Sequence, residues 1–364
     1  MNNDFLEGKF FSGANSPRGF ISRFNDLYNS EDGWFSYIIK GGPGTGKSTL
    51  MKKVAMAAMK KGVKTQLIYC SSDPESLDAI VFPEKKICMV DGTAPHVMEP
   101  MYPGASEVIL NLGECWKCKQ LRGKQKEIIY ISKKNSALHK RSQRYLAACG
   151  AISIDSYNVV AASVNKEKCL DYATRLSKRL FRKKKDCIGK ETARLISGIT
   201  PNGLVFFEDT IKDLANDIYL IDDEYSVASN IILSEIRKNA LRSGFNITTC
   251  FCPIDPINKI DAIIVPELDL AFAVSNSWHP LNGLQAHRNI HAKRFMELSK
   301  LSKRKQRLSF NKRIARELLN EAIYNLAEAK AVHDELEKLY IESMDYDKVN
   351  AVAEKTIKEI LDMI

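Results

Sequence analysis

The chain has 364 residues, of which 45% are hydrophobic and 27% charged, and its formal net charge is +10. This length suffices for two domains, and the composition is typical of a globular protein with a substantial core. No apolar run approaches the roughly 18–20 residues of a membrane-spanning helix, the first residues carry no secretory signal pattern, and the nine cysteines lack framework spacing. We therefore expect a cytoplasmic protein with reduced thiols and no membrane contact.

The N-terminal part of the chain predicts strands that alternate with helices. In chain order we expect a first strand over 9–12, a short helix over 18–28, a strand over 34–39, a helix over 50–61, and strands over 65–70, 87–91 and 108–112. Such alternation favours an α/β fold, in which a parallel sheet carries helices on both of its faces. From about residue 114 to 181 the periodicity is helical, and it is helical again over about 284–364.

The stretch between the strand expected at 34–39 and the following helix fits the phosphate-binding pattern G-x-x-x-x-G-K-[ST]. Glycines in such a loop let backbone N–H groups approach phosphate oxygens, and the helix N-terminus adds a favourable dipole. The lysine of this pattern reaches the β- and γ-phosphates, and the hydroxyl after it ligates Mg²⁺. The predicted ATP site consists of Gly41, Gly42, Pro43, Gly44, Thr45, Gly46, Lys47, Ser48 and Thr49. Lys47 is the expected catalytic cation, and Ser48 is an expected ligand of Mg²⁺.

The second half of the chain repeats the first. Tyr37-Ile38-Ile39 matches Tyr219-Leu220-Ile221, the segment 78–84 matches 261–267, and His96 falls on His279. A period of about 180 residues indicates a domain duplication. We expect two P-loop NTPase-like domains, residues 1–185 and 186–364, each with an appended helical hairpin.

The phosphate-binding loop is lost in the second copy. Residues 223–231 stand opposite residues 41–49 and contain neither glycine nor lysine. Three acids, Asp222, Asp223 and Glu224, stand where a polyphosphate would lie, and like charges there would repel it. We therefore expect the second domain to bind no nucleotide and to act as a regulatory or structural partner of the first.

Asp91 is the second expected catalytic residue and an expected ligand of Mg²⁺. It ends the apolar run 87–90, as the acid of a Walker B strand does, and the matching run 271–274 has no acid. The loss of this acid together with Lys47 favours a shared chemical role. The alternative is an aspartate that begins a turn.

The sequence does not identify the residue that would activate water. Gly92 follows Asp91, at a position where many ATPases have a glutamate. Asp73, Asp78, Glu84 and His96 are candidates for the base, and Ser71, Ser72 and Thr93 are weaker candidates for contacts with ligand. Because His279 persists in the second half, a structural role is favoured for His96. No Asn-Lys-x-Asp guanine signature stands in the expected place, which favours ATP over GTP.

With both repeats and the segment Asp91-Gly92-Thr93-Ala94-Pro95-His96 in view, the chain resembles an uncharacterised bacterial family of tandem P-loop ATPases. The resemblance covers nearly the whole chain. It implies a P-loop NTPase fold and ATP binding, and it implies no particular substrate.

The alternatives to a hydrolase are a nucleotide or small-molecule kinase and a nucleotide-gated module that binds nucleic acid. Residues 117–144 hold ten Lys or Arg against one acid, and the matching residues 293–313 hold nine against one. Basic helices at equivalent positions suit an acidic protein or a nucleic acid, but a solvated helix face is the more common reason for such a run.

Overall fold

The computed structural model describes residues 5–182 and 186–364. We call these two parts repeat one and repeat two; residue 185, the expected end of the first domain, lies outside them. The strands of repeat one are β1 (Leu6–Phe11), β2 (Gly13–Ser16), β3 (Gly19–Ser22), β4 (Phe35–Lys40), β5 (Thr65–Tyr69), β6 (Leu77–Phe82), β7 (Ile87–Asp91) and β8 (Glu107–Asn111). Its helices are α1 (Lys47–Lys60), α2 (Cys118–Gly123), α3 (Gln125–Ala161) and α4 (Lys166–Leu180).

Repeat two has a closely similar series of elements. Its strands are β9 (Glu191–Arg194), β10 (Ser197–Thr200), β11 (Gly203–Phe206), β12 (Asp217–Asp222), β13 (Ile247–Cys252), β14 (Asp255–Val265), β15 (Leu270–Ser275) and β16 (Arg288–His291). Its helices are α5 (Glu208–Leu214), α6 (Val227–Arg242), α7 (Leu298–Ser302), α8 (Lys305–Ile341) and α9 (Tyr346–Met363). Helix α5 stands where repeat one has only a 3₁₀ turn, Phe24–Asp26.

Each repeat contains one six-stranded mixed sheet, and the two sheets have the same strand order. Sheet one runs β1-β5-β6-β7-β4-β8, and sheet two runs β9-β13-β14-β15-β12-β16. In each sheet the third strand is antiparallel to both neighbours, whereas the other pairs are parallel. The expectation of an all-parallel sheet is therefore wrong. The connections on either side of β6 are too short for a helical crossover, which needs a dozen or more residues, so β6 returns as a hairpin.

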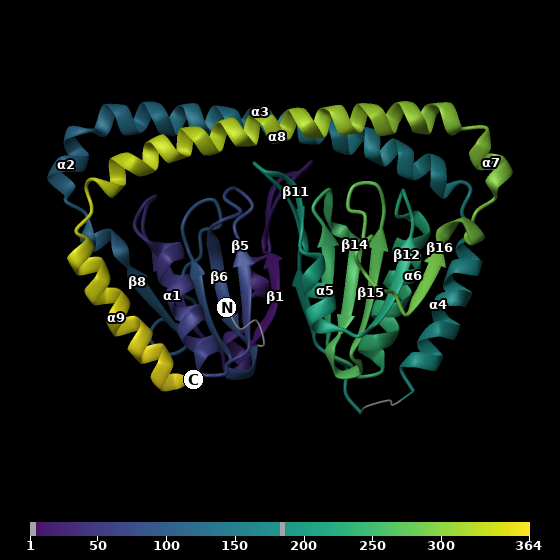
Figure 1. The fold of residues 1–364 in the computed structure, drawn as a ribbon, viewed down its shortest axis with the longest axis horizontal. Coiled ribbons are helices and arrows are strands. Elements are labelled where there is room, and N and C mark those ends of the chain that lie inside the picture. The colour runs from purple at the N-terminus through teal and green to yellow at the C-terminus, as the bar shows by residue number, and fades with distance from the viewer. Residues whose placement is uncertain (1–4, 183–185) are drawn as a thin grey trace.

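The two sheets face each other across a shared apolar core (Figure 1). This core includes Ile38 and Val90 of sheet one and Ile218 and Ala273 of sheet two, together with α5. The outer face of sheet one is covered by α1 and α9, and the outer face of sheet two by α4 and α6. The sequence predicts helices on both faces of each sheet; on the inner side the structure has the other sheet together with the short helix α5.

The helical hairpin expected within each repeat is also replaced by a different arrangement. Helices α3 and α8 have 37 residues each and are therefore about 55 Å long, which exceeds the width of one sheet. They lie antiparallel to one another across the ends of both sheets (Figure 1), and Ser142 Oγ donates to the carbonyl oxygen of Ala322 at 2.9 Å. The apolar faces of α3 and α8 thus bury each other. Each of these helices begins beside its own repeat and ends beside the other repeat.

The last helix of each repeat therefore packs on the opposite repeat. Helix α4 of repeat one lies against α6, and α9 of repeat two lies against α1, where Ala353 and Ile360 enter the core of sheet one. Short antiparallel bridges, Trp116 with Met344 and Val164 with Met296, fix the two crossing points. A further bridge joins Phe11 and Leu195 between the sheets. The two repeats thus exchange their last helices, in an approximately twofold arrangement (Figure 1).

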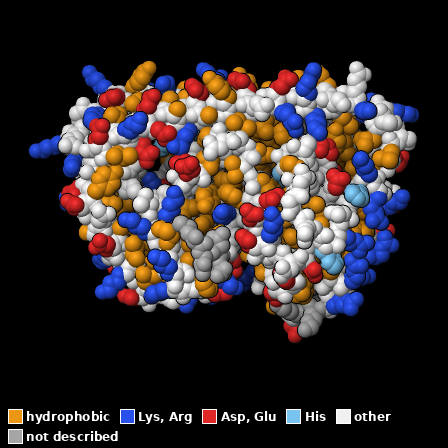
Figure 2. All heavy atoms as spheres, in the orientation of Figure 1, with side chains coloured by type: hydrophobic (Ala, Val, Ile, Leu, Met, Phe, Trp, Pro, Cys, Tyr) orange, Lys and Arg blue, Asp and Glu red, His pale blue; other side chains and the backbone are white. Residues whose placement is uncertain are grey.

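The two basic segments lie at opposite ends of this crossing pair. Residues 117–144 form α2 and the first part of α3, while residues 293–313 form α7 and the first part of α8. Some of their charges are balanced within the chain, as by Arg307 with Asp155 and Lys312 with Glu224. Figure 2 shows further Lys and Arg side chains gathered over α4, at the right edge of this face. Among the described residues, no helix combines the length and apolar character needed to cross a membrane.

Candidate functional site

Residues 41–46 of the phosphate-binding pattern form a loop between β4 and α1, at the carboxyl ends of β4 and its parallel neighbours β7 and β8. Gly44 and Gly46 have φ values of 67° and 85°, a region that favours glycine because a Cβ would crowd the backbone. Gly46 is the N-cap of α1, and no side chain caps this helix. The N–H groups in the first turn of a helix have no intrahelical partner, so they are available to an anion at the loop.

Lys47 and Asp91 come together at the ends of neighbouring parallel strands. Strand β4 pairs with β7 so that Ile39 lies opposite Asp91. Lys47 Nζ lies 3.6 Å from Asp91 Oδ2 and donates hydrogen bonds to the carbonyl oxygens of Gly41 and Gly42, at 3.1 and 2.8 Å. The expected catalytic pair is therefore adjacent.

The hydroxyl residues of the loop have separate surroundings. Ser48 Oγ accepts a hydrogen bond from the backbone N–H of Leu77 at 2.9 Å, which places it beside the start of β6. Thr45 is buried and donates to the carbonyl oxygen of Gly42 at 2.9 Å, so it closes the loop. Thr49 is exposed and lies in the first turn of α1. Ser48 keeps a lone pair for a cation, and Thr49 faces a neighbouring cavity.

The structure adds Asp78 and His96 to the site. Asp78, Asp91 and His96 are all buried, and one ligand atom from each lies within 4.8 Å of the others. Burial, and next the charge of Asp91, raise the pKa of Asp78 to about 8, while Lys47 opposes the shift. Burial lowers the pKa of His96, and Asp91 partly opposes that change.

Two other candidates for the base, Glu84 and Asp73, are paired with lysines. Glu84 is paired with Lys64 at 3.2 Å near the opposite end of the sheet. Asp73 accepts from Ser76 Oγ at 2.8 Å and faces Lys330 of α8 at 3.6 Å. Thr93 supports Asp91, because its N–H and hydroxyl donate to Asp91 Oδ1 at 2.9 and 2.6 Å. The comparison of the two halves of the sequence favours a role in the shared fold for Asp78 and His96, since both recur in repeat two.

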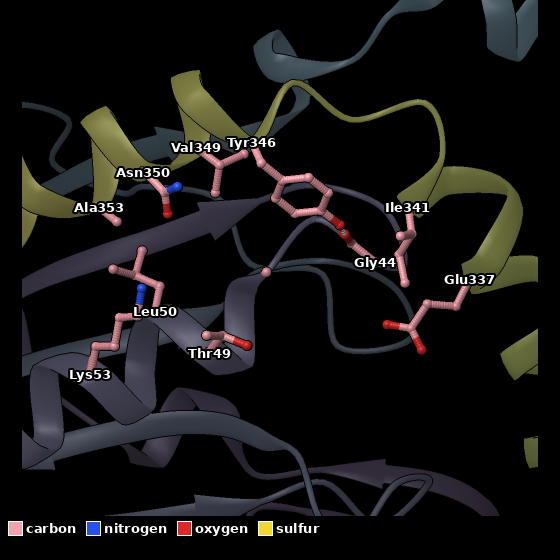
Figure 3. Close-up of a pocket in the computed structure, with 11 residues that line it drawn as sticks. Gly44, Thr49, Leu50, Lys53, Glu337, Ile341, Tyr346, Val349, Asn350 and Ala353 are labelled. Atoms are coloured by element: carbon pink, nitrogen blue, oxygen red, sulfur yellow. Dashed lines mark hydrogen bonds between the residues drawn. The ribbon is translucent and has the colours of Figure 1, made fainter.

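A cavity of about 220 Å³ lies between the loop and the helices that repeat two contributes (Figure 3). In Figure 3, Thr49, Leu50 and Lys53 of α1 form one side, and Tyr346 and Asn350 of α9 form the other. Its volume is below the roughly 300–1,000 Å³ of most ligand pockets. A larger ligand therefore requires the helices to move apart.

The corresponding loop in repeat two is shorter and contains no glycine: four residues separate β12 from α6, whereas six separate β4 from α1. Ser226 is the N-cap of α6, as Gly46 is of α1, and it has a φ of 55°. Asp223 Oδ2 accepts from the backbone N–H of Ser229 at 2.9 Å, and Asp223 Oδ1 accepts from that of Tyr225 at 3.3 Å. A carboxylate of the chain itself thus lies at the N-terminus of α6, where a phosphate would bind in a working loop.

The other two acids of residues 222–224 and the half-buried Lys259 have partners of their own within the chain. Glu224 accepts from Ser277 Oγ and pairs with Lys312 of α8, both at 2.6 Å, while Asp222 is exposed beside His291. The surroundings of Lys259 disfavour its charged form through desolvation, but Cys252 and next the charges of Asp261 and Asp223 raise its pKa overall. The segment Asn258-Lys259-Ile260-Asp261 does read N-K-x-D, but it lies inside β14 rather than in a loop at a strand end.

Residues 36–93 match a protein family described as Novel STAND NTPase 3. The match runs from β4 through α1 to the residues after β7, so it includes Lys47 and Asp91, and it does not reach repeat two. Neither the curated proteins nor the solved structures gave a match. Over this segment the chain is similar to a nucleotide-binding NTPase family.

Proposed function

We propose that repeat one binds ATP with Mg²⁺ and hydrolyses it, and that repeat two holds no nucleotide and serves as a regulatory or structural partner. One observation carries this proposal: Lys47 Nζ and Asp91 Oδ2 lie 3.6 Å apart, beside an uncapped helix N-terminus. A lysine for the phosphates and an acid for the metal ion are the groups that phosphoryl transfer requires. The family match spans both residues.

The residues of repeat one fit both ligands. Lys47 and the first turn of α1 would hold the phosphates, and Ser48 and Asp91 would hold Mg²⁺ directly or through water. The bound metal ion neutralises charge that develops on the phosphates. Asp78 and His96 are the base candidates that lie beside Asp91, and the raised pKa of Asp78 suits proton transfer near neutral pH.

The geometry of repeat two supports its assignment as a site without nucleotide. The Asp223 carboxylate accepts hydrogen bonds from the backbone N–H groups of Tyr225 and Ser229, at the helix N-terminus where a phosphate would need such donors. Removal of that carboxylate alone would not restore a site, because residues 223–231 contain no lysine. The charges of Asp261 and Asp223 act on the half-buried Lys259 of β14, which is not part of this loop.

Calorimetric titration with MgATP tests the proposal. We expect one site per chain in the wild-type protein, no measurable binding in Lys47→Ala, and unchanged binding in Lys60→Ala, which removes an exposed lysine from the same helix. Two sites per chain, or tight binding by Lys47→Ala, would contradict it.

Phosphate release then separates the functions. Release without an added acceptor supports hydrolysis, whereas transfer only in the presence of an acceptor supports a kinase. Binding to DNA or RNA that weakens steeply with salt would support the nucleic-acid alternative.

A further inference from the structure

The cluster of Asp78, Asp91 and His96 has the composition of a metal site rather than of a simple acid pair. Asp78 lies in β6, Asp91 ends β7, and His96 lies in the loop that follows β7. Their exposed fractions are 5%, 8% and 7%, and one oxygen or nitrogen of each lies within 4.8 Å of the others. Two carboxylates and an imidazole are thus held together away from solvent.

The His96 ring is held in place, but its nitrogens are not used by the chain. The ring stacks on Phe24 with their centroids 4.0 Å apart. Among the described residues, neither Nδ1 nor Nε2 of His96 has a hydrogen-bond partner. Buried polar atoms are paired in the great majority of cases, and leaving one unpaired costs free energy. A buried imidazole that is fixed and unpaired beside two carboxylates indicates a ligand at this point.

The cluster also contains the carboxyl groups that could balance the charge of a cation. Asp78 and Asp91 face one ammonium group, that of Lys47, whose Nζ lies 3.6 Å from Asp91 Oδ2. Asp73 is a further acid that acts on Asp78. A bound cation that takes the place of the Asp78 proton would therefore face two carboxylate charges and one ammonium charge.

Repeat two keeps part of this cluster and lacks the rest. Asp261 and His279 take the places of Asp78 and His96, and His279 Nε2 lies 3.7 Å from Asp261 Oδ1. The strand pairing puts Val274 opposite Ile221, where repeat one has Asp91 opposite Ile39. Lys259 contributes its charge next to Asp261. Repeat two therefore has two of the three ligands and a lysine of its own beside them.

We propose that Asp78, Asp91 and His96 form a divalent-cation site that binds metal without nucleotide and prefers Mn²⁺ to Mg²⁺. Carboxylate oxygens suit both ions, whereas an imidazole nitrogen suits transition metals. The site goes beyond the proposed Mg²⁺ ligands, Ser48 and Asp91, by adding Asp78 and His96.

Lys47 couples this site to the phosphates, and this step alone rests on the proposed function. The ammonium of Lys47 and a metal ion compete for Asp91, so a triphosphate that attracts Lys47 would leave Asp91 to the metal. Lys47→Met should therefore weaken the binding of ATP and strengthen the binding of Mn²⁺ in the absence of nucleotide.

Titration of metal-stripped protein with MnCl₂, followed by electron paramagnetic resonance, tests the site without any nucleotide. We expect one Mn²⁺ per chain, affinity at least about tenfold weaker in Asp78→Asn and in His96→Phe, and several-fold tighter binding in Lys47→Met. The matched variants Asp261→Asn and His279→Phe in repeat two should bind Mn²⁺ as the wild type does. No Mn²⁺ bound by the wild-type protein would overturn the proposal.

A second measurement needs no variant, so it does not depend on whether His96→Phe folds. Electron spin echo envelope modulation of the Mn²⁺-loaded wild-type protein should show coupling to one imidazole nitrogen, and its absence would remove His96 from the site. MgATP calorimetry reports on the proposed function separately. Mn²⁺ binding without ATP binding would leave the metal site standing, and ATP binding without Mn²⁺ binding would leave only the proposed function.

Discussion

The hydroxyl of Tyr346 donates a hydrogen bond to the carbonyl oxygen of Gly44 at 3.2 Å, although 302 positions separate the two residues. The end of α8 reaches the same glycine, since a Cβ on Gly44 would lie 2.8 Å from Ile341 Cγ1. We call the end of α8 and helix α9 the C-terminal arm. This arm of repeat two lies directly on the loop of repeat one that we propose to bind phosphate, so it covers one side of that loop.

Loss of the Tyr346 hydrogen bond should speed the binding of nucleotide. A neutral hydrogen bond contributes about 0.5–1.5 kcal/mol, so Tyr346→Phe should raise the association rate by roughly twofold to tenfold if the arm must move first. Stopped-flow fluorescence with a labelled ATP measures this rate. Tyr324→Phe, at an exposed position on α8, is the control. Equal association rates in Tyr346→Phe and wild type would show that the hydrogen bond does not limit access.

The exchange of helices between repeats makes the stability of repeat one depend on repeat two. Ile360 of α9 is fully buried in the core of sheet one. Ile360→Ala should lower the free energy of unfolding by about 2–5 kcal/mol. Hydrogen exchange should show that the amides of α1 lose protection while those of α6 keep it. Lys358→Ala, at an exposed position on α9, should stay close to wild type. Equal loss of protection in both repeats would indicate that they unfold as one unit.

The sequence predicted the individual strands better than their arrangement. The strands expected at 34–39, 65–70, 87–91 and 108–112 correspond to β4, β5, β7 and β8. The expected helix over 18–28 is wrong, because Gly19 adopts a φ of 98° and β3 pairs with β2. Strand pairing overrode local helix propensity there. Helical periodicity shows that a face is buried, but it does not show which repeat buries it, so the exchange of α4 and α9 was not predictable.

The sequence comparison between repeats found one part of the site and concealed another. It singled out Lys47 and Asp91, which the structure brings together, because both are absent from repeat two. It set aside Asp78 and His96, because Asp261 and His279 repeat them. A residue type that occurs in both halves can have a structural role in one half and contact a ligand in the other. Here the two halves differ in that Asp91 lies beside Asp78 and His96 in repeat one.

Asp223 should stabilise repeat two as an internal cap of α6. Its carboxylate accepts the N–H groups of Tyr225 and Ser229. Asp223→Ala should therefore lower the free energy of unfolding by about 0.5–2 kcal/mol. Asp223→Asn keeps a hydrogen-bond acceptor, so it should lower the free energy of unfolding by less. Chemical denaturation measures both, with the exposed Asp222→Asn as control. A stable Asp223→Ala variant that also binds a second MgATP would contradict the assignment of repeat two.

Asp91 should be required for the use of Mg²⁺. Asp91→Asn keeps the shape of the side chain and its acceptor for Thr93 but removes the negative charge that a cation needs. We expect the Mg²⁺ concentration for half-maximal ATP hydrolysis to rise at least about 10–100-fold, with slower turnover and an unchanged circular dichroism spectrum. The same substitution at the exposed Asp222 of repeat two is the control. A wild-type rate at limiting Mg²⁺ would remove Asp91 from the mechanism.

Asp78 should make the stability of the protein depend on pH. Burial, and next the charge of Asp91, raise the pKa of Asp78 to about 8, whereas an aspartate in the unfolded chain titrates near 3.9. Between about pH 4 and pH 8 the folded protein therefore binds one proton more than the unfolded chain at this residue, and the free energy of unfolding falls as pH rises, by at most ~1.4 kcal/mol per pH unit.

Asp78→Asn removes the titrating carboxyl and should flatten this decline. Urea denaturation from pH 5 to pH 8, with a chelator present to keep metal ions away, measures the slope for both proteins. Asp362→Asn, at an exposed position near the end of α9, should keep the wild-type slope. If Asp78→Asn also kept it, the carboxyl of Asp78 would be ionised in the folded protein, because only an already ionised group could be replaced without changing the proton balance of unfolding.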